Sequence, residues 1–209
     1  MSTPSKAGVT ALAHANPEPT ERELPGDTLA AAQRGERWAR RALVHTYQGR
    51  VHALVWRLLA GAGRQDQVED LVQDAFLRVF QALPRFTVAG PARLSTWILS
   101  IATRAVIDEL RRPGPRKTPL EVVEDELAGG ERPDVHSERR AMGRAIEAAV
   151  ASLSPEVRAA FVLRAYHELD YAEIAQALEV GLGTVKSRLW RARAALQEHL
   201  QEVRQEARR

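Results

Sequence analysis

The sequence predicts an all-α protein built from two small helical domains that are joined by a flexible acidic linker. Apolar residues make up 44% of the 209 residues and aromatic residues only 5%. In two long stretches the apolar residues recur at helical spacing, whereas the period-two pattern that is typical of strands does not occur. A stretch rich in proline, glycine and acidic residues separates them, which indicates a linker.

Composition narrows the possible classes of protein. The chain has no cysteine, so it has neither a disulfide framework nor a thiolate zinc site. It has no apolar run long enough to cross a membrane and no signal-peptide sequence at its start, so we expect a cytoplasmic protein without membrane insertion. Its histidines lack metal-ligand spacing, and its acids and serines form no catalytic pattern. We therefore expect no enzymatic activity, no cofactor, no metal site and no small-molecule substrate.

The N-terminal part of the chain predicts a tail and two helices. Residues 1–26 hold several prolines among small and polar residues, and we expect them to be disordered because they bury too little apolar area to offset the entropy of ordering. Asp27 is expected to be the N-cap of a short helix, and Gly35 to separate that helix from a longer one. Apolar residues recur at helical spacing over 37–59, and Gly61 then ends the second helix.

Two more helices complete a predicted N-terminal domain, residues 27–112. A wide apolar stripe predicts a helix over 67–83. A loop that contains Gly-Pro follows over 85–94, and Ser95 or Thr96 is expected to be the N-cap of the next helix. That helix ends at an Arg-Arg-Pro sequence, because proline does not continue a helix.

Residues 113–137 form the predicted linker, and residues 138–205 form the C-terminal domain. The linker carries three basic and six acidic side chains, which give it a net charge of −3. A solvated spacer is sufficient to explain this composition.

Leu153-Ser154-Pro155 is predicted to open a helix of the C-terminal domain. A pair of helices with a tight turn between them follows. Asp170 precedes the first helix, over 171–178, and Thr184 is expected to be the N-cap of the second. Val185 and Leu189 are expected to pack inward, at helical spacing. The outer side of the second helix is rich in cations and fits the major groove of DNA, although a solvated face is the alternative. The residues that we expect to contact DNA are Thr184, Lys186, Ser187, Arg188, Trp190, Arg191 and Arg193.

The C-terminal sequence resembles that of a known family. GTVKSRLWRAR, together with the upstream LSPEVRAAFVLR and YAEIAQAL, is similar to region 4 of bacterial RNA polymerase sigma factors, the sigma-70 family. The short two-domain layout resembles the extracytoplasmic function (ECF) subfamily. This resemblance implies that the C-terminal helix pair reads the −35 promoter element.

The N-terminal domain supports the same resemblance. EDLVQDAFLRVFQALPRF is similar to the region 2 segment that binds core polymerase, and STWILSIATRAVIDELRR to the segment that opens and reads the −10 element. The resemblance implies that four residues dock on a coiled coil of the β′ subunit: Asp70, Leu71, Gln73 and Asp74. From the residues alone we would interpret these four as an ordinary solvated face.

The resemblance also implies a −10 reading and melting site in the predicted 85–94 loop and the helix after it. Its residues would hold a flipped base and contact the phosphates of the unwound strand. They are Arg85, Phe86, Arg93, Ser95, Trp97, Arg104, Asp108, Arg111 and Arg112. For Trp97, packing in the core is an equally good interpretation. Two residues depart from the family pattern: Arg104 replaces a common asparagine, and Glu179 replaces the usual turn glycine.

The resemblance implies a sigma factor that binds core polymerase, reads both promoter elements and helps to melt the DNA. The implied partners are promoter DNA, core RNA polymerase through its β′ coiled coil and β flap, and an anti-sigma factor, with nucleoid association when bound to polymerase. The acidic linker would suit a positively charged polymerase channel. The rival classes are a response-regulator-type transcription factor, a pure interaction module and a helical enzyme. The response-regulator type needs an α/β domain upstream, and 27–112 shows no strand pattern.

Overall fold

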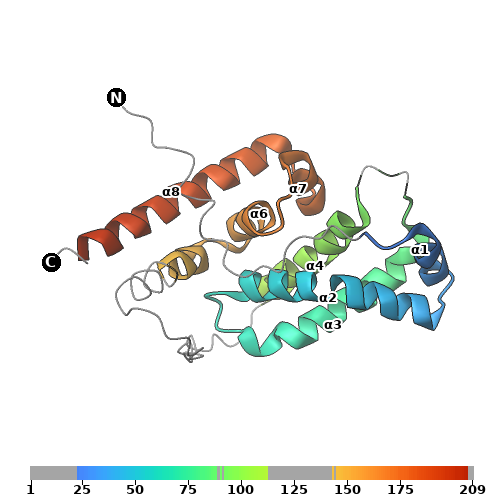
Figure 1. Cartoon of the computed structure of the whole chain (residues 1–209). Coiled ribbons are helices and arrows are strands. Elements are labelled where there is room, and N and C mark those ends of the chain that lie inside the picture. Colours follow the sequence, from blue (N-terminus) through green and yellow to red (C-terminus); the bar gives the residue numbers. More distant parts are fainter. Residues whose placement is uncertain (1–22, 89, 91, 113–142, 144, 207–209) are drawn as a thin grey trace, which may run out of the picture.

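The computed structural model describes residues 23–88, 90, 92–112, 143 and 145–206, and these residues form helices and connecting segments without a strand (Figure 1). The all-α prediction is therefore confirmed. The labelled helices are α1 (Gly26–Gln33), α2 (Arg37–Leu59), η3 (Gln65–Gln67), α3 (Val68–Ala82), η4 (Leu83–Arg85), α4 (Leu94–Arg111), α6 (Pro155–Ala165), α7 (Tyr171–Leu178) and α8 (Leu182–Glu206). Residues 145–152 form a further helical stretch before α6. Within the described part of the chain, no helix is long and apolar enough to cross a membrane.

The N-terminal half, α1–α4, is built around the long helix α2. Helices α3 and α4 pack against α2 and against each other, and α1 packs against α2 near its start. The apolar stripes that predicted these helices face inward, as shown by the burial of Leu43, Leu54, Val79 and Ile98 to 1% exposure or less. In this arrangement one side of α3 and one side of α4 face away from α2.

Two predicted starts of elements in the N-terminal half are wrong. Leu24 is 8% exposed and belongs to the core, although it lies in the predicted tail, and Asp27 lies in the first turn of α1, whose N-cap is Pro25. Helix α4 begins at Leu94, with Arg93 as its N-cap, so the expected caps at Ser95 and Thr96 are instead buried in the first turn. Leu24 just before α1 and Leu94 at the first position of α4 are both buried in the core.

The second helix of the C-terminal pair also begins earlier than predicted. Helix α8 starts at Leu182, and Thr184 lies in its first turn, where its backbone N–H bonds to the carbonyl of Gly181. The predictions for α6 and α7 are confirmed. Ser154 precedes Pro155 at the first position of α6, and Asp170 is the N-cap of α7.

The C-terminal half, α6–α8 together with residues 145–152, lies over α2 and α4 (Figure 1). Helix α7 packs against α4, and α6 packs against α2. Buried apolar residues from Leu24 to Leu189 form one continuous cluster that includes both halves. The predicted linker, residues 113–137, lies outside the described residues. Residues 1–22 of the predicted tail also lie outside them.

One buried arginine joins the two halves. Arg158 of α6 is 4% exposed, and its guanidinium donates to the carbonyl oxygens of Leu58, at 2.8 Å, and Ala60, at the end of α2. It also donates to the carbonyls of Val150 and Ala151, near the end of the helical stretch 145–152, and to the carbonyl of Leu153, which follows that stretch. The last carbonyls of a helix lack partners within it, so one cation satisfies two helix ends and interacts favourably with both dipoles. Burial lowers the pKa of Arg158 to about 10, which still leaves it charged at neutral pH.

Gly61 allows the close approach that Arg158 needs. It has a φ of +71°, and a Cβ atom at this position would lie 2.6 Å from the Cβ and carbonyl oxygen of Ala151. Such a contact is closer than atoms allow, and the backbone conformation also favours glycine. The glycine that was expected only to end α2 therefore also brings α2 against the C-terminal half.

Candidate nucleic-acid interface

The turn between α7 and α8 has the shape that a glycine would give it. Asp170 and Glu173 form a capping box at the start of α7, with both hydrogen bonds at 2.8 Å. At its end, Glu179 adopts the left-handed conformation, with φ 53° and ψ 45°. The N–H of Val180 then bonds to the carbonyl of Ala175 at 3.0 Å. The departure from glycine thus keeps the turn geometry, at a cost of about 1–2 kcal/mol for a residue with a side chain.

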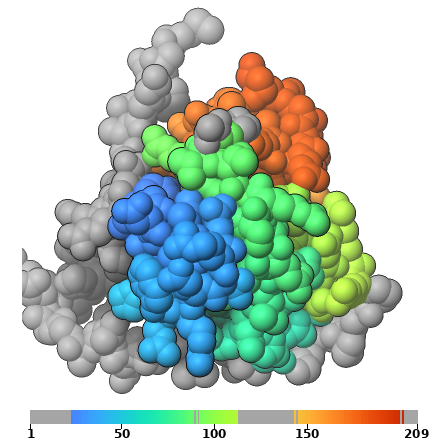
Figure 2. Space-filling model, turned by 90° about the vertical axis from the view of Figure 1, so that its right-hand side faces the viewer, coloured from blue at the N-terminus to red at the C-terminus, as the bar shows by residue number. Residues whose placement is uncertain are grey.

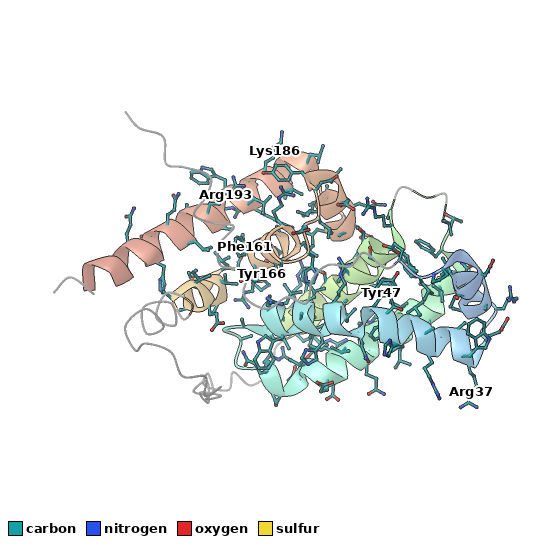
Figure 3. All side chains as sticks on the ribbon, in the orientation of Figure 1. Arg37, Tyr47, Phe161, Tyr166, Lys186 and Arg193 are labelled. Carbon is teal, nitrogen blue, oxygen red and sulfur yellow. The ribbon has the colours of Figure 1, made fainter. Side chains whose placement is uncertain are left out.

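Helix α8 has a buried side and an exposed cationic side. Val185, Leu189 and Ala192 are at most 3% exposed and pack against α6 and α7, as predicted for the first two. Trp190 on the other side is 69% exposed. Lys186 points away from the rest of the molecule (Figure 3). Six of the seven residues predicted to contact DNA are exposed: Thr184, Lys186, Ser187, Trp190, Arg191 and Arg193.

The seventh predicted residue, Arg188, lies on a different side of α8. It is half-buried, and burial lowers its pKa. The negative charge of Glu156 in α6 acts on Arg188, as do the positive charges of Arg191 and Arg111. Arg188 lies three residues after Val185 and one before Leu189, and this spacing places it at the border of the buried side of α8. The prediction grouped the cations by their closeness in the sequence and did not consider on which side of the helix each one lies.

The residues predicted for −10 reading gather around the segment between η4 and the start of α4, which we call the η4–α4 loop (residues 86–93, of which 89 and 91 are not described). The rings of Phe86 and Trp97 lie with their centroids 4.9 Å apart, and both residues are half-buried. Arg85 and Arg93 on either side are exposed. The loop therefore places a tilted pair of aromatic rings close in the sequence to two exposed cations.

Further along α4, its outer side is covered by α7. The hydroxyl of Thr96 donates to Glu173 Oε1 at 3.1 Å, and Arg104 forms an ion pair with Glu179. A cavity of about 170 Å³ lies between the two helices, beside Trp97 and these residues. The two residues that depart from the family pattern, Arg104 and Glu179, are thus direct partners, 75 positions apart in the sequence.

The end of α4 makes ion pairs in two directions. Arg111 donates to Glu156 of α6 at 3.1 Å. Burial alone would raise the pKa of Glu156, but the hydrogen bonds from its own backbone and from Arg111 outweigh that effect and lower it. Asp108 faces Arg78 of α3 at 3.8 Å. The remaining predicted residue, Arg112, is exposed and pairs with a glutamate of its own helix.

The four residues predicted to bind polymerase do not share one face of α3. Asp70 and Gln73 are exposed, Asp74 is half-exposed and bonded to Arg78 at 2.9 Å, and Leu71 is 8% exposed and belongs to the core. Leu77 was not among the predicted residues, although it lies one turn after Gln73 and is 53% exposed. The only sign in the sequence that it would be exposed was its position outside the apolar stripe of the helix.

Comparison with known proteins identifies the family. The family model described as Sigma-70 region 2 matches residues 43–115, and the one described as Sigma-70, region 4 matches residues 143–196. The ECF RNA polymerase sigma factor SigW of Bacillus subtilis is 30% identical over 188 residues, which cover 84% of this chain and 96% of that relative. The chain belongs to the sigma-70 family of sigma factors, in its ECF subfamily.

One further relative agrees with this membership, and one solved structure shares the fold. The ECF RNA polymerase sigma factor SigE of Mycolicibacterium smegmatis is 35% identical over 161 residues, which cover 76% of this sigma factor and 60% of the relative. The co-crystal structure of the sigma factor RpoE with the anti-sigma factor NepR from Bartonella quintana covers 77% of this sigma factor and 98% of that chain, with a TM-score of 0.57 and 23% identity. The second similarity concerns the fold. As an ECF sigma factor, this protein acts in promoter-specific transcription initiation by RNA polymerase.

Proposed function

We propose that this sigma factor reads the −35 element with the exposed side of α8 and the −10 element with the η4–α4 loop and the start of α4, while α3 binds polymerase. The division of α8 into a buried side and an exposed cationic side carries this proposal, because a helix packed in this way presents its cations, together with Trp190, to a partner. The proposal includes no chemical step by the sigma factor, since polymerase supplies the chemistry.

At −35, the exposed side of α8 enters the major groove. Lys186 and Arg191 project from its first turns, where a recognition helix meets base edges. Arginine pairs bidentately with guanine, and each such pair contributes about 1–3 kcal/mol of discrimination. Arg193, further along, is placed for phosphate contact, which positions the helix without reading sequence.

At −10, the aromatic pair of Phe86 and Trp97 would receive a base taken out of the duplex. Removing a base from the stack costs a few kcal/mol, and stacking on an aromatic ring returns about 1–3 kcal/mol. The cations Arg85 and Arg93 on either side would hold the phosphates of the unwound strand.

The covered side of α4 has a consequence for this mechanism. Thr96 and Arg104 contact α7 in this structure, so they reach DNA only when α7 moves away from α4. The ion pair between Arg104 and Glu179 is partly exposed, and a pair of this kind contributes only about 0–1 kcal/mol. We therefore expect the contact between α4 and α7 to open more readily than the buried contact around Arg158.

Replacing Glu179 with glutamine is expected to increase the affinity of the full-length protein for single-stranded −10 DNA by about threefold to fivefold, because it removes the ion pair that occupies Arg104. Fluorescence anisotropy with the non-template −10 strand of a mapped promoter measures this change. Glu168→Gln is the matched control, since Glu168 is also an exposed glutamate with positive φ, at 57°. An equal gain for both variants would indicate a general charge effect and contradict the prediction.

Replacing Asp70 with lysine is expected to weaken binding of core polymerase by about tenfold or more, because it places a like charge against a partner that is complementary to an acidic patch. Asp70 is a cleaner choice than Asp74, whose carboxylate is bonded to Arg78. A pull-down titration with core enzyme measures the affinity, and circular dichroism checks helicity. The control is Asp27→Lys, at an exposed position of α1, a helix that the proposal does not place at polymerase. Unchanged binding by the Asp70 variant would remove α3 from the interface.

We further propose that the C-terminal half contacts the β flap of polymerase, that the protein joins the nucleoid with polymerase, and that an anti-sigma factor holds it inactive. The last of these is supported by the similarity in fold to RpoE, which was crystallised with the anti-sigma factor NepR. Transcription in vitro with purified core polymerase and a genomic library tests the central proposal. We expect transcripts that depend on the added protein and whose start sites share two upstream elements. Absence of such transcripts would contradict it.

A further inference from the structure

The η4–α4 loop is held at both ends by a segment that precedes the region 2 match. That match begins at residue 43, whereas Glu23 lies just before α1 and Gln33 is its last residue. At the start of the loop, Gln33 Nε2 donates to the carbonyl oxygens of Leu83, at 3.1 Å, and Phe86, at 2.7 Å. Figure 2 shows α1, in blue, beside the green segment that contains the loop, with the orange end of the C-terminal half above them.

At the end of the loop, Glu23 supplies what the first turn of α4 lacks. The N-cap residue Arg93 makes no side-chain capping bond, and the first turn contains no acidic residue. Glu23 Oε1 accepts hydrogen bonds from the hydroxyl of Ser95, at 2.5 Å, and from its backbone N–H, at 3.4 Å. A carboxylate at this place satisfies a donor that has no partner within the helix and suits the positive end of the helix dipole.

The second oxygen of Glu23 is also fixed. The hydroxyl of Tyr47 donates to Glu23 Oε2 at 2.9 Å and accepts from the backbone N–H of Leu24 at 3.1 Å. Tyr47 is 3% exposed, and burial raises the pKa of its hydroxyl, so it remains a donor at neutral pH. Both oxygens of the carboxylate are therefore engaged, and the main chain next to it is anchored. This is the geometry of a built contact, which a mobile surface acid would lack.

We infer that Glu23 and Gln33 are positioning residues for −10 recognition: they fix the two ends of the η4–α4 loop and so set the place of Phe86 and Trp97. The inference rests on the proposed function of that loop. For the removal of the Glu23 carboxylate, the inference predicts a change in promoter opening opposite in sign to the change that electrostatics alone would cause. If Glu23 acted only through its charge, its removal would favour the binding of negatively charged DNA. As a positioning residue, its removal lowers promoter opening.

The test compares full-length variants with core polymerase on a promoter mapped with the wild-type protein and on a copy with one −10 base changed. Glu23→Ala and Gln33→Ala are each expected to reduce open-complex formation on the native promoter about fivefold to tenfold, as measured by permanganate reactivity of −10 thymines. The ratio of transcription from the native promoter to transcription from the altered copy, which measures −10 specificity, should fall toward one. Glu23→Gln keeps an acceptor for Ser95, so its loss should be smaller. Affinity for core polymerase should stay unchanged.

Glu36→Ala is the matched control. This glutamate follows the same helix, but its carboxylate binds Arg34 and Trp38 and leaves the loop untouched. An effect of Glu23→Ala equal to that of Glu36→Ala, a gain in opening, or a proportional loss on both promoters would overturn the inference while leaving the proposed function intact. A wild-type protein that gives no promoter-specific transcript would overturn the proposed function, and the inference with it.

Discussion

Replacing Arg158 with methionine is expected to lower the free energy of unfolding by about 3–5 kcal/mol, the largest effect of any single substitution proposed for this protein. Methionine keeps the length of the stem but removes every donor, so the carbonyls of Leu58, Ala60, Val150, Ala151 and Leu153 lose their bonds to it. Each buried carbonyl left without a partner costs about 1–3 kcal/mol, and water that enters the site recovers part of this. Urea denaturation followed by circular dichroism measures the change.

The control for this variant is Arg164→Met on the same helix. Arg164 is exposed, donates to the carbonyl of Leu169 at 2.9 Å and lies over the ring of Tyr171, so its loss should cost about 1 kcal/mol or less. If the two variants unfolded at the same urea concentration, the guanidinium of Arg158 would not be the contact that holds the two halves together.

Replacing Arg191 with alanine is expected to weaken binding of the holoenzyme to promoter DNA by about tenfold to a hundredfold. Arg191 is exposed, and its contact with the carbonyl of Ser187, at 3.4 Å, is weak enough to be exchanged for a base or a phosphate. The two uses differ in their signatures. Loss of a base contact should relax specificity at one −35 position, whereas loss of a phosphate contact should weaken all sequences alike and reduce the salt dependence by about one unit.

Arg188→Ala provides the matched comparison on the same helix. Arg188 is half-buried beside Glu156, so its removal should change stability more than DNA affinity. Gel-shift titrations on one −35 variant series compare the two arginines directly. If Arg188→Ala cost as much affinity as Arg191→Ala, the exposed side of α8 would not be the side that meets DNA.

The helices and their inward faces followed from the sequence because apolar spacing is a local property. The period of Val185 and Leu189 placed the buried side of α8 correctly, and Ser154 with Pro155 marked the start of α6. The starts of α4 and α8 were wrong because the capping side chains available there, at Ser95 and Thr184, were not the residues that ended up at the boundary. Local preference yielded to tertiary packing at these two places.

The contacts between distant parts of the chain had no local signal. Nothing near Glu23 in the sequence points to Ser95, 72 positions away, and nothing near Arg158 points to Leu58. The two departures from the family pattern, Arg104 and Glu179, were visible as separate anomalies, but only the structure shows that they are partners. Sequence reasoning therefore found the candidate surfaces, whereas the residues that position and cover those surfaces came from three-dimensional contacts.

Because Leu58 and Arg158 are 100 positions apart, the contact between them forms only some time after α2 has been synthesised. At roughly 5–20 residues per second, a ribosome needs about 5–20 s to add the residues between them. During that interval the carbonyls at the end of α2 have no guanidinium to bind, and water must serve them instead. Helix α7, which packs on the side of α4 that we propose to read the −10 element, is made later still. The chain of each new molecule thus contains the surface proposed to melt the promoter before it contains the helix that covers that surface.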